Sequence, residues 1–451
     1  MRFPVRSLCV TSAALFLFGA ISGYAQNAKP TRMVPAHLRK EPVDVHKVQK
    51  FSPQAVLSVR TGGPVAGAGA RLLSGPVADV ATTTGALGTI SGLQTIPTFS
   101  GAFAAQNGPT TDDPYGLGTV FPFIMVGNDP LTVGTTTIPA KITEVSLTLL
   151  NADSSVNTTV NFTKTFDDVM TDSPNYANAT YDSSEVPTQF ADAVHRASFF
   201  YLAKPNWHTK LGGPTIVNHV TWTIPFSVSV QFPDGTIEAV NSWYTGTATD
   251  GSTYVLVLNL LFNALYDNQV VNDIVAGNFT PNAINQDWLP NTFLFSANEA
   301  NPTSPGGCCV LGFHTYFYEY GVTPQPRWMT LFASYIAPGL FGGGTQDVTA
   351  MSHEISETFA DPFLSNQTPV WQFPGGSTSC AGNLETGDPV EVLPTSTVAI
   401  TLTEGLTILT FHPQTEALLQ WFEMGATSNA IGGAFSYPDK TALTASAVPC
   451  P

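Results

Sequence analysis

Positive charge is scarce over most of this chain. Residues 72–451 contain only seven lysines and arginines against 31 aspartates and glutamates, which leaves this region about 24 charges negative. A surface that binds nucleic acid needs lysines and arginines to neutralise phosphates, so this composition excludes nucleic acid as a partner. An acidic, lysine-poor surface is typical of an extracellular protein that its net charge keeps soluble.

Long apolar runs are also lacking. The N-terminal run of residues 8–20 follows Arg2 and Arg6 and precedes the small residues Gly23 and Ala25. This arrangement predicts a secretory signal peptide over residues 1–25. No later stretch approaches the ~18 apolar residues of a membrane span. We therefore expect a secreted protein, extracellular or periplasmic, with no membrane span in the mature chain.

Cysteine is rare in this sequence. Of five cysteines, Cys9 lies in the predicted signal peptide, and Cys308, Cys309, Cys380 and Cys450 remain. Four cysteines allow three pairings, and an oxidising compartment favours disulfide bonds. We expect the adjacent cysteines not to bond to each other, because a bridge between neighbours is strained. Zinc binding by cysteine is not favoured, since no Cys-x-x-Cys motif is present.

The chain divides by composition and pattern. Residues 26–108 are rich in proline, glycine and alanine and predict a flexible leader: a pro-segment, a wall-proximal spacer, or a linker without a role of its own. Residues 109–225 predict a β-rich domain, and residues 226–451 a metal-site domain. Strand patterns lie at residues 119–126, 142–150, 156–162, 215–224, 227–232, 253–266, 291–296, 308–318 and 328–336, with one helix at 188–202. The pattern at 253–266 predicts a strand that passes into a helix.

Residues 347–361 have the pattern of one amphipathic helix. Asp347 is a good N-cap, and Pro362 ends the helix because it pushes Asp361 out of helical geometry. One stripe of this helix is apolar: Val348, Met351, Ile355 and Phe359. The opposite face is ionisable: His353, Glu354, Glu357 and Asp361. Such a face either surrounds a cation or points into water.

The spacing of this ionisable face favours metal chemistry. In the motif His-Glu-x-x-His, residues i and i+4 bind zinc, and the glutamate acts as general base on the metal-bound water. Here Glu357 takes the second ligand position beside His353, and Glu354 takes the position of the base. The predicted metal is zinc, and the carboxylate ligand also admits manganese or calcium.

The remaining ligands must come from outside this helix. Glu385 and Asp388 lie on a glycine-containing loop, and we favour Glu385 over Asp361 as the third ligand. Asp388 is either another ligand or a supporting partner. The alternative is that this loop is only a turn held by its acidic side chains. His314, in the preceding aromatic strand, either stabilises an oxyanion or is a core residue.

These segments predict an α+β fold. In it a β-rich N-terminal half precedes a mixed-sheet, zincin-like half with one site-bearing helix, by analogy with zinc-dependent peptidases. The chain contains no phosphate loop, no dinucleotide fingerprint and no Gly-x-Ser-x-Gly elbow.

Four motifs carry a resemblance to a known group. They are residues 308–315 (CCVLGFHT), 352–362 (SHEISETFADP), 383–389 (NLETGDP) and 435–438 (FSYP). From about residue 108 onward, the chain resembles a group of uncharacterised exported proteins of soil bacteria. The segment ending in Asp361-Pro362 is also similar to bacterial relatives of the plant exordium/phosphate-induced proteins. This resemblance implies an extracellular protein and supplies no reaction.

The sequence therefore predicts an exported metal-dependent hydrolase that is peptidase-like. His353, Glu357 and Glu385 would hold the metal, Glu354 would deprotonate water, and His314 would assist as electrophile. The substrate would be an extracellular protein or cell-wall material. The alternative is a secreted binding or wall-associated protein in which the same residues hold a structural cation or no metal.

Overall fold

The structure is a computed structural model that describes residues 41–48, 57–58, 95–105, 119–342, 344–404 and 407–450. The predicted signal peptide, residues 1–25, lies outside the described residues, as does most of the predicted leader, residues 26–108. Within that leader, the described pieces contain short strands, which are given below with their sheets.

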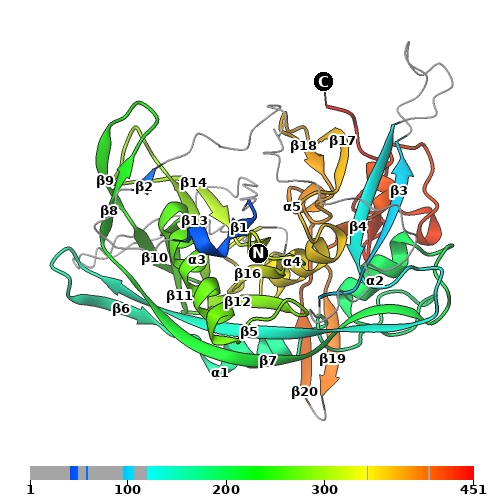
Figure 1. The fold of residues 1–451 in the computed structure, drawn as a ribbon, viewed down its shortest axis with the longest axis horizontal. Helices are drawn as coiled ribbons and strands as arrows, with labels where there is room; N and C mark the ends of the chain where they lie inside the picture. The colour runs from blue at the N-terminus through cyan, green and yellow to red at the C-terminus, as the bar shows by residue number, and fades with distance from the viewer. Residues whose placement is uncertain are drawn as a thin grey trace, which may run out of the picture.

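A seven-stranded sheet organises the molecule. Its order is β1-β15-β16-β12-β5-β6, and β7 also pairs with β5. The parallel strands β5 and β7 are 17 and 18 residues long, and Figure 1 shows them as a curved ribbon across the whole width of the fold. The strands are β1 (Val43–Asp44), β5 (Gly134–Leu150), β6 (Val156–Val160), β7 (Trp207–Ile224), β12 (Ile284–Pro290), β15 (Gly312–Tyr318) and β16 (Arg327–Tyr335).

Smaller sheets surround this one. A four-stranded sheet contains β10 (Trp243–Thr247), β11 (Thr253–Leu258), β13 (Thr292–Ala297) and β14 (Pro305–Val310). A three-stranded sheet contains β2 (Leu57–Ser58), β8 (Ser227–Gln231) and β9 (Ile237–Asn241). The strand pairs are β3 (Thr98–Ala104) with β4 (Val120–Val126), β17 (Gln367–Gln372) with β18 (Cys380–Asn383), β19 (Ile400–Glu404) with β20 (Thr407–Phe411), and β21 (Glu416–Ala417) with β22 (Ser436–Tyr437).

The helices are short, with one exception. They are α1 (Lys164–Thr171), α2 (Phe190–Ser198), α3 (Asn259–Ala276), α4 (Thr349–Ala360), α5 (Asp388–Glu391) and α6 (Leu419–Phe422), with single turns at Val45–Lys47 and Ile431–Gly433. A membrane-crossing helix, long and apolar enough for the task, does not occur in the part of the chain that the structure describes.

The predicted fold class is wrong. Of the described residues, 41% lie in strands and 18% in helices, and the strands continue through the whole chain instead of giving way to a zincin-like half. The seven-stranded sheet places β12, β15 and β16 beside β5 and β6. Strand patterns identify strands, but parallel partners more than a hundred residues apart leave no local signal, which explains the error.

Individual strands and helices agree better with the predictions made from the sequence. The strand pattern at residues 142–150 lies within β5, and that at 328–336 lies within β16 except for its last residue. The pattern at 253–266 does pass from a strand, β11, into a helix, α3. The aromatic stretch 308–318, predicted as one strand, is divided between β14 and β15, which belong to different sheets.

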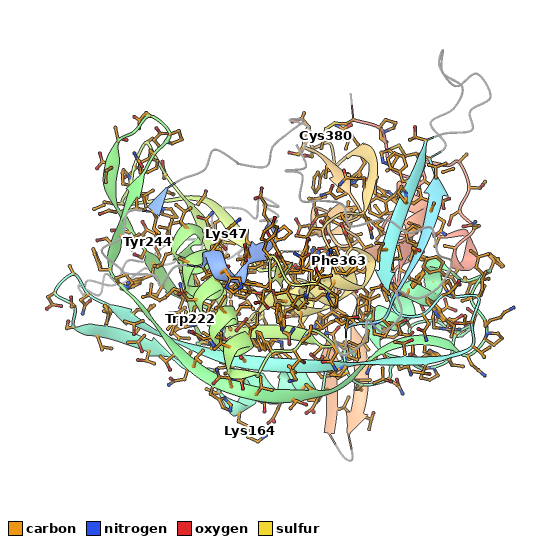
Figure 2. The ribbon with its side chains drawn as sticks, in the orientation of Figure 1. Lys47, Lys164, Trp222, Tyr244, Phe363 and Cys380 are labelled. Carbon is orange, nitrogen blue, oxygen red and sulfur yellow. A yellow bond between two sulfur atoms is a disulfide. The ribbon has the colours of Figure 1, made fainter. Side chains whose placement is uncertain are left out.

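The largest core joins the two larger sheets through α3. Leu261 and Phe262 of α3 are fully buried in it. The ring of Phe262 lies 5.3 Å from that of Trp222 in β7 and 4.6 Å from that of Phe332 in β16. Trp222 is labelled in Figure 2. A second core lies between this sheet and α4, where Met351, Ile355 and other side chains of the predicted apolar stripe are buried. The stripe is thus confirmed, and it fixes α4 on the sheet.

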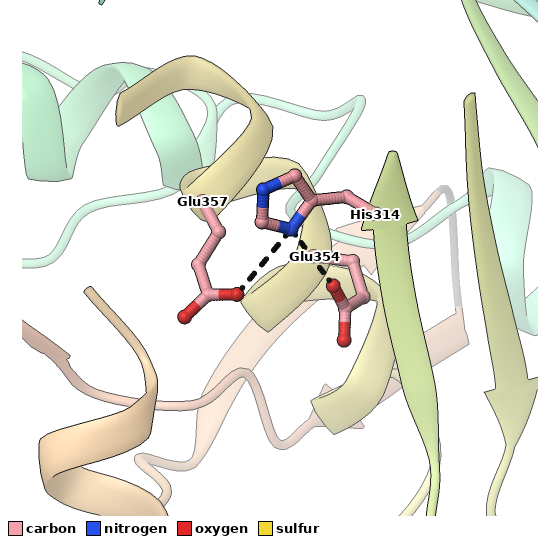
Figure 3. A group of neighbouring side chains, drawn as sticks. All are labelled: His314, Glu354 and Glu357. Carbon is pink, nitrogen blue, oxygen red and sulfur yellow. Dashed lines mark hydrogen bonds and ion pairs between the residues drawn. The ribbon is translucent and has the colours of Figure 1, made fainter. Parts of the chain in front are cut away.

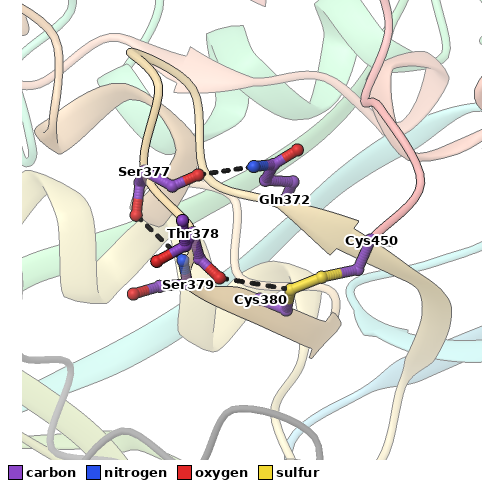
Figure 4. Close-up of a disulfide and its surroundings, with 6 residues drawn as sticks. All are labelled: Gln372, Ser377, Thr378, Ser379, Cys380 and Cys450. Atoms are coloured by element: carbon purple, nitrogen blue, oxygen red, sulfur yellow. Dashed lines mark hydrogen bonds between the residues drawn. A yellow bond between two sulfur atoms is a disulfide. The ribbon is translucent and has the colours of Figure 1, made fainter.

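The cysteines form two bridges. Cys308 and Cys309 bond to each other, so the prediction that these neighbours do not pair is wrong. Cys380 of β18 bonds to Cys450, which brings the end of the described chain beside the β17–β18 pair (Figure 4). The strain of a bridge between neighbouring cysteines disfavours such a bond without forbidding it, so adjacency in the sequence did not exclude this pair.

Candidate metal centre

The helix that carries the candidate motif is α4, Thr349–Ala360. All twelve of its residues are buried, so its ionisable face does not point into water. The helix ends at Ala360, directly before Asp361 and Pro362, as predicted. Its N-cap is Val348, not Asp347 as predicted. Asp347 has a positive φ of 43°, and its carboxylate instead accepts hydrogen bonds from the amides of Val348 and His412.

His314 approaches this helix from β15, which packs directly against α4. Its Nδ1 lies 3.4 Å from Oε2 of Glu354 and 3.5 Å from Oε2 of Glu357 (Figure 3). These three ligand atoms lie within 4.8 Å of one another, which is close enough to share one ion. His314 is therefore a buried core residue and also a neighbour of the two carboxylates.

His353 forms a second group on the same helix. Its Nε2 lies 3.1 Å from Oε2 of Glu357, one turn further on, and 3.7 Å from Oδ1 of Asp388 at the start of α5. Oε1 of Glu354 is 3.9 Å from the same nitrogen. His353, Glu357 and Asp388 also place their ligand atoms within 4.8 Å of one another, so they too could hold a metal ion.

The other two predicted ligands, Glu385 and Asp361, lie outside these two three-residue groups. Glu385 has its Oε2 3.7 Å from Nε2 of His314, on the other side of that ring from Glu354. Asp361 accepts hydrogen bonds from the amides of Ser365 and Asn366, so its carboxylate shapes the turn after α4. Neither residue belongs to the two three-residue groups described above.

We call six side chains the His/carboxylate cluster: His314, His353, Glu354, Glu357, Glu385 and Asp388. Each is at most 4% exposed. Burying several carboxylates together is strongly unfavourable unless positive charge accompanies them. In the metal-free state that charge can come only from protons on the imidazoles, and in a loaded state it comes from a cation.

Two glycines create the space for these side chains. A Cβ at Gly387 would lie 2.3 Å from Nδ1 of His353, and a Cβ at Gly312 would lie 2.7 Å from Cγ of Glu354. The amide of Gly387 also donates a hydrogen bond of 3.0 Å to Oε1 of Glu357. Only glycine lets the backbone approach so closely, and the loop thereby orients Glu357.

Neither these two glycines nor Glu416 was predicted from the sequence as part of the site. Glu416 of β21 is fully buried. Burial and the charges of Glu357 and Glu354 raise its pKa well above the usual value, although His353 acts to lower it. For Gly387, the run Glu385-Thr-Gly-Asp388 was a usable signal, because a glycine between two candidate ligands indicates a close backbone approach. Nothing near Glu416 in the sequence points to the cluster.

Both histidines bind protons tightly. Burial acts to lower the pKa of His314, but neighbouring carboxylates, first Glu385 and then Glu354 and Glu357, raise it to about 10. For His353, burial likewise acts to lower the pKa, and Glu357 and Glu354 raise it well above its ordinary value. A metal ion therefore has to displace these protons, because only the neutral imidazole is a ligand.

This competition predicts how stability depends on pH. A raised histidine pKa stabilises the metal-free fold fully below the unfolded value of 6.5, and the contribution of His314 is lost as the pH rises towards 10. A bound cation replaces the protons, so the metal-loaded protein should not share this loss. Thermal unfolding of chelator-treated and zinc-loaded protein, measured across this pH range, checks the prediction. Parallel pH profiles for the two forms would contradict it.

The described residues bury the cluster almost completely, since each of its six side chains is at most 4% exposed. A small cavity beside α4 is lined by His195, Ser356, Thr386 and apolar side chains, and by none of the six cluster side chains. A catalytic metal needs an open coordination position that a substrate can reach. The described form is thus compatible with holding a cation and does not present it to a substrate.

The fold and the site together define a β-rich protein with a buried group of histidines and carboxylates that could hold a metal ion. The chain matches no family model, no curated protein and no solved structure. The resemblance to exported soil-bacterial proteins therefore depends on the four motifs alone and stays a prediction.

Proposed function

We propose that the protein is an exported metal-dependent hydrolase, peptidase-like, acting on extracellular protein or cell-wall material. One observation carries the proposal: Glu354 lies between the two imidazoles, with Oε1 3.9 Å from His353 and Oε2 3.4 Å from His314. In the His-Glu-x-x-Glu arrangement, this is the position of a general base beside a metal ligand. The N-terminal signal-peptide pattern and the disulfides support export.

In this proposal, His353, Glu357 and Asp388 hold the metal. A metal ion there would polarise a water molecule and a substrate carbonyl. Glu354 would take a proton from the water as the oxygen of the water bonds to the carbonyl carbon. It would then pass this proton to the leaving group as the bond between the carbonyl carbon and that group breaks. His314 donates a hydrogen bond to the carbonyl oxygen as that oxygen gains charge. Glu385, next to Nε2 of His314, holds the orientation of that ring.

The donor atoms bear on the choice of metal. Imidazole nitrogen combined with carboxylate oxygen suits zinc and manganese, whereas calcium prefers oxygen ligands alone. We propose zinc first and manganese second, with calcium least favoured.

Burial favours a second candidate function. Because the six cluster side chains are nearly inaccessible to solvent, a cation there could serve to neutralise the buried carboxylates and fix α4 against β15 and α5. The protein would then be a secreted binding or wall-associated protein with a structural metal.

Replacing Glu354 with glutamine separates the two candidates. For a hydrolase, we expect the rate of hydrolysis of an unfolded protein such as casein to fall about 100-fold or more, because the general base is lost. At least one equivalent of metal should remain. The matched control is Glu144→Gln, since Glu144 is also buried and paired with a histidine, His219, but lies outside the cluster. Metal-bound wild-type protein without hydrolytic activity, destabilised by chelation, would instead establish the structural role.

A further inference from the structure

We propose that the His/carboxylate cluster holds two divalent transition-metal ions side by side, bridged by the carboxylate of Glu357. The first position has His353, Glu357 and Asp388 as ligands, and the second has His314, Glu354 and Glu357. This inference rests on the metal-binding half of the proposed function and does not require hydrolysis. With two ions bound, His314 and Glu354 are ligands of the second ion, in place of the electrophile and base roles they have with one ion.

The distances suit two ions better than one. Ligands about 2.1 Å from a tetrahedral metal lie about 3.4 Å apart. His314 meets Glu354 and Glu357 at 3.4 and 3.5 Å, and His353 meets Glu357 and Asp388 at 3.1 and 3.7 Å. Each group is therefore already spaced for an ion of its own.

The two imidazoles also belong to different groups. Neither set of ligand atoms within 4.8 Å contains both His314 and His353. Two ligands of one ion with bonds of about 2.1 Å lie at most about 4.2 Å apart. One ion thus satisfies one histidine and leaves the other facing carboxylates alone. Oε2 of Glu357 faces both histidines, which is the position of a bridge.

The net charge of the buried cluster also favours two divalent ions over one. The cluster contains four carboxylates, those of Glu354, Glu357, Glu385 and Asp388, all nearly inaccessible to solvent. With neutral imidazoles as ligands, a single divalent ion leaves two negative charges buried, and two divalent ions leave none. Uncompensated buried charge is costly, so the second cation removes a large penalty.

The imidazole ring of His314 has the surroundings of a metal-bound histidine. Its Nε2 is buried, makes no hydrogen bond to the described residues, and lies 3.7 Å from Oε2 of Glu385. With its proton on Nε2 and directed at Glu385, the ring presents the lone pair of Nδ1 to Glu354 and Glu357. This carboxylate–imidazole arrangement is the usual support of a metal-bound histidine. Gly312, where a Cβ would overlap Glu354, leaves that carboxylate room to reach the second position.

Metal stoichiometry tests this arrangement. Purified protein, loaded with zinc and desalted, should contain two equivalents by elemental analysis and by native mass spectrometry. His314→Gln and His353→Gln should each retain one equivalent, and Glu357→Gln should retain none. The control His412→Gln should retain two, because His412 pairs with Asp347 outside the cluster. One equivalent in the wild type, lost in both cluster histidine variants, would overturn the proposal.

A second measurement needs no substitution. Two Mn²⁺ ions about 3.5–4 Å apart, the usual spacing of a two-metal site, give an exchange-coupled paramagnetic resonance spectrum, whereas isolated Mn²⁺ gives six separate lines. Manganese-loaded wild-type protein should show the coupled spectrum. Two coupled ions without hydrolysis would leave this inference standing and end the hydrolase proposal. One isolated ion with hydrolysis would do the reverse, and no bound metal would end both.

Discussion

Replacing Gly387 with alanine is expected to destabilise the protein by about 1–3 kcal/mol, the usual cost of inserting a methyl group into a filled interior. The new Cβ would lie 2.3 Å from Nδ1 of the buried His353, and the amide of Gly387 is tied to Glu357. Either the ring or the loop has to move. Both movements separate His353 from Asp388, so metal affinity should fall by more than the about 10–100-fold that loss of a supporting residue costs.

Chemical denaturation and zinc titration of this variant check both effects. The matched control is Gly382→Ala in neighbouring β18, where a Cβ would meet only Val370, at an ordinary 3.6 Å. That variant should retain both stability and metal affinity. Equal metal affinity in the two variants would show that close packing of Gly387 on His353 does not position the ligand.

Removing the bridge between Cys380 and Cys450 is expected to have the largest effect on stability. The two cysteines are 70 residues apart, and opening a loop of that length should lower the free energy of unfolding by about 4 kcal/mol in the chain-entropy account. The loop includes Glu385 and Asp388, so metal affinity should weaken as well.

The double variant Cys380→Ser/Cys450→Ser, compared with the wild type by chemical denaturation, measures this cost. Cys308→Ser/Cys309→Ser is the matched control, since those cysteines are adjacent and their bridge closes almost no loop. If both double variants lost the same stability, loop entropy would not be the source of the effect.

Local elements of this fold could be predicted, and their partners could not. The alternation of residues 142–150 and the apolar stripe of α4 reflect contacts that repeat every two or every three to four residues, so a short window contains them. The pairing of β12 with both β5 and β16 depends on residues far apart in the chain. The division of residues 308–318 between two sheets could not be predicted from the sequence for the same reason.

The candidate site divides in a similar way. His353, Glu354 and Glu357 were identifiable because helical spacing places them on one face. Asp388 could be named as a candidate, but its closeness to His353 depends on how the Gly387 loop returns to α4. Glu416 belongs to a two-residue strand paired with β22, and no local pattern marks it.

The order in which the chain is made gives the described arrangement a further consequence. His314, the α4 residues and Asp388 come from segments spread along the later part of the chain, and β1, the earliest described strand, pairs with β15. A chain emerges from the ribosome N-terminus first, so β1 exists long before its neighbour does. For a chain exported as proposed, the ligands meet only after nearly all of it has crossed the membrane. An ion bound by the cluster would then be acquired in the destination compartment, and its identity would follow the metals present there.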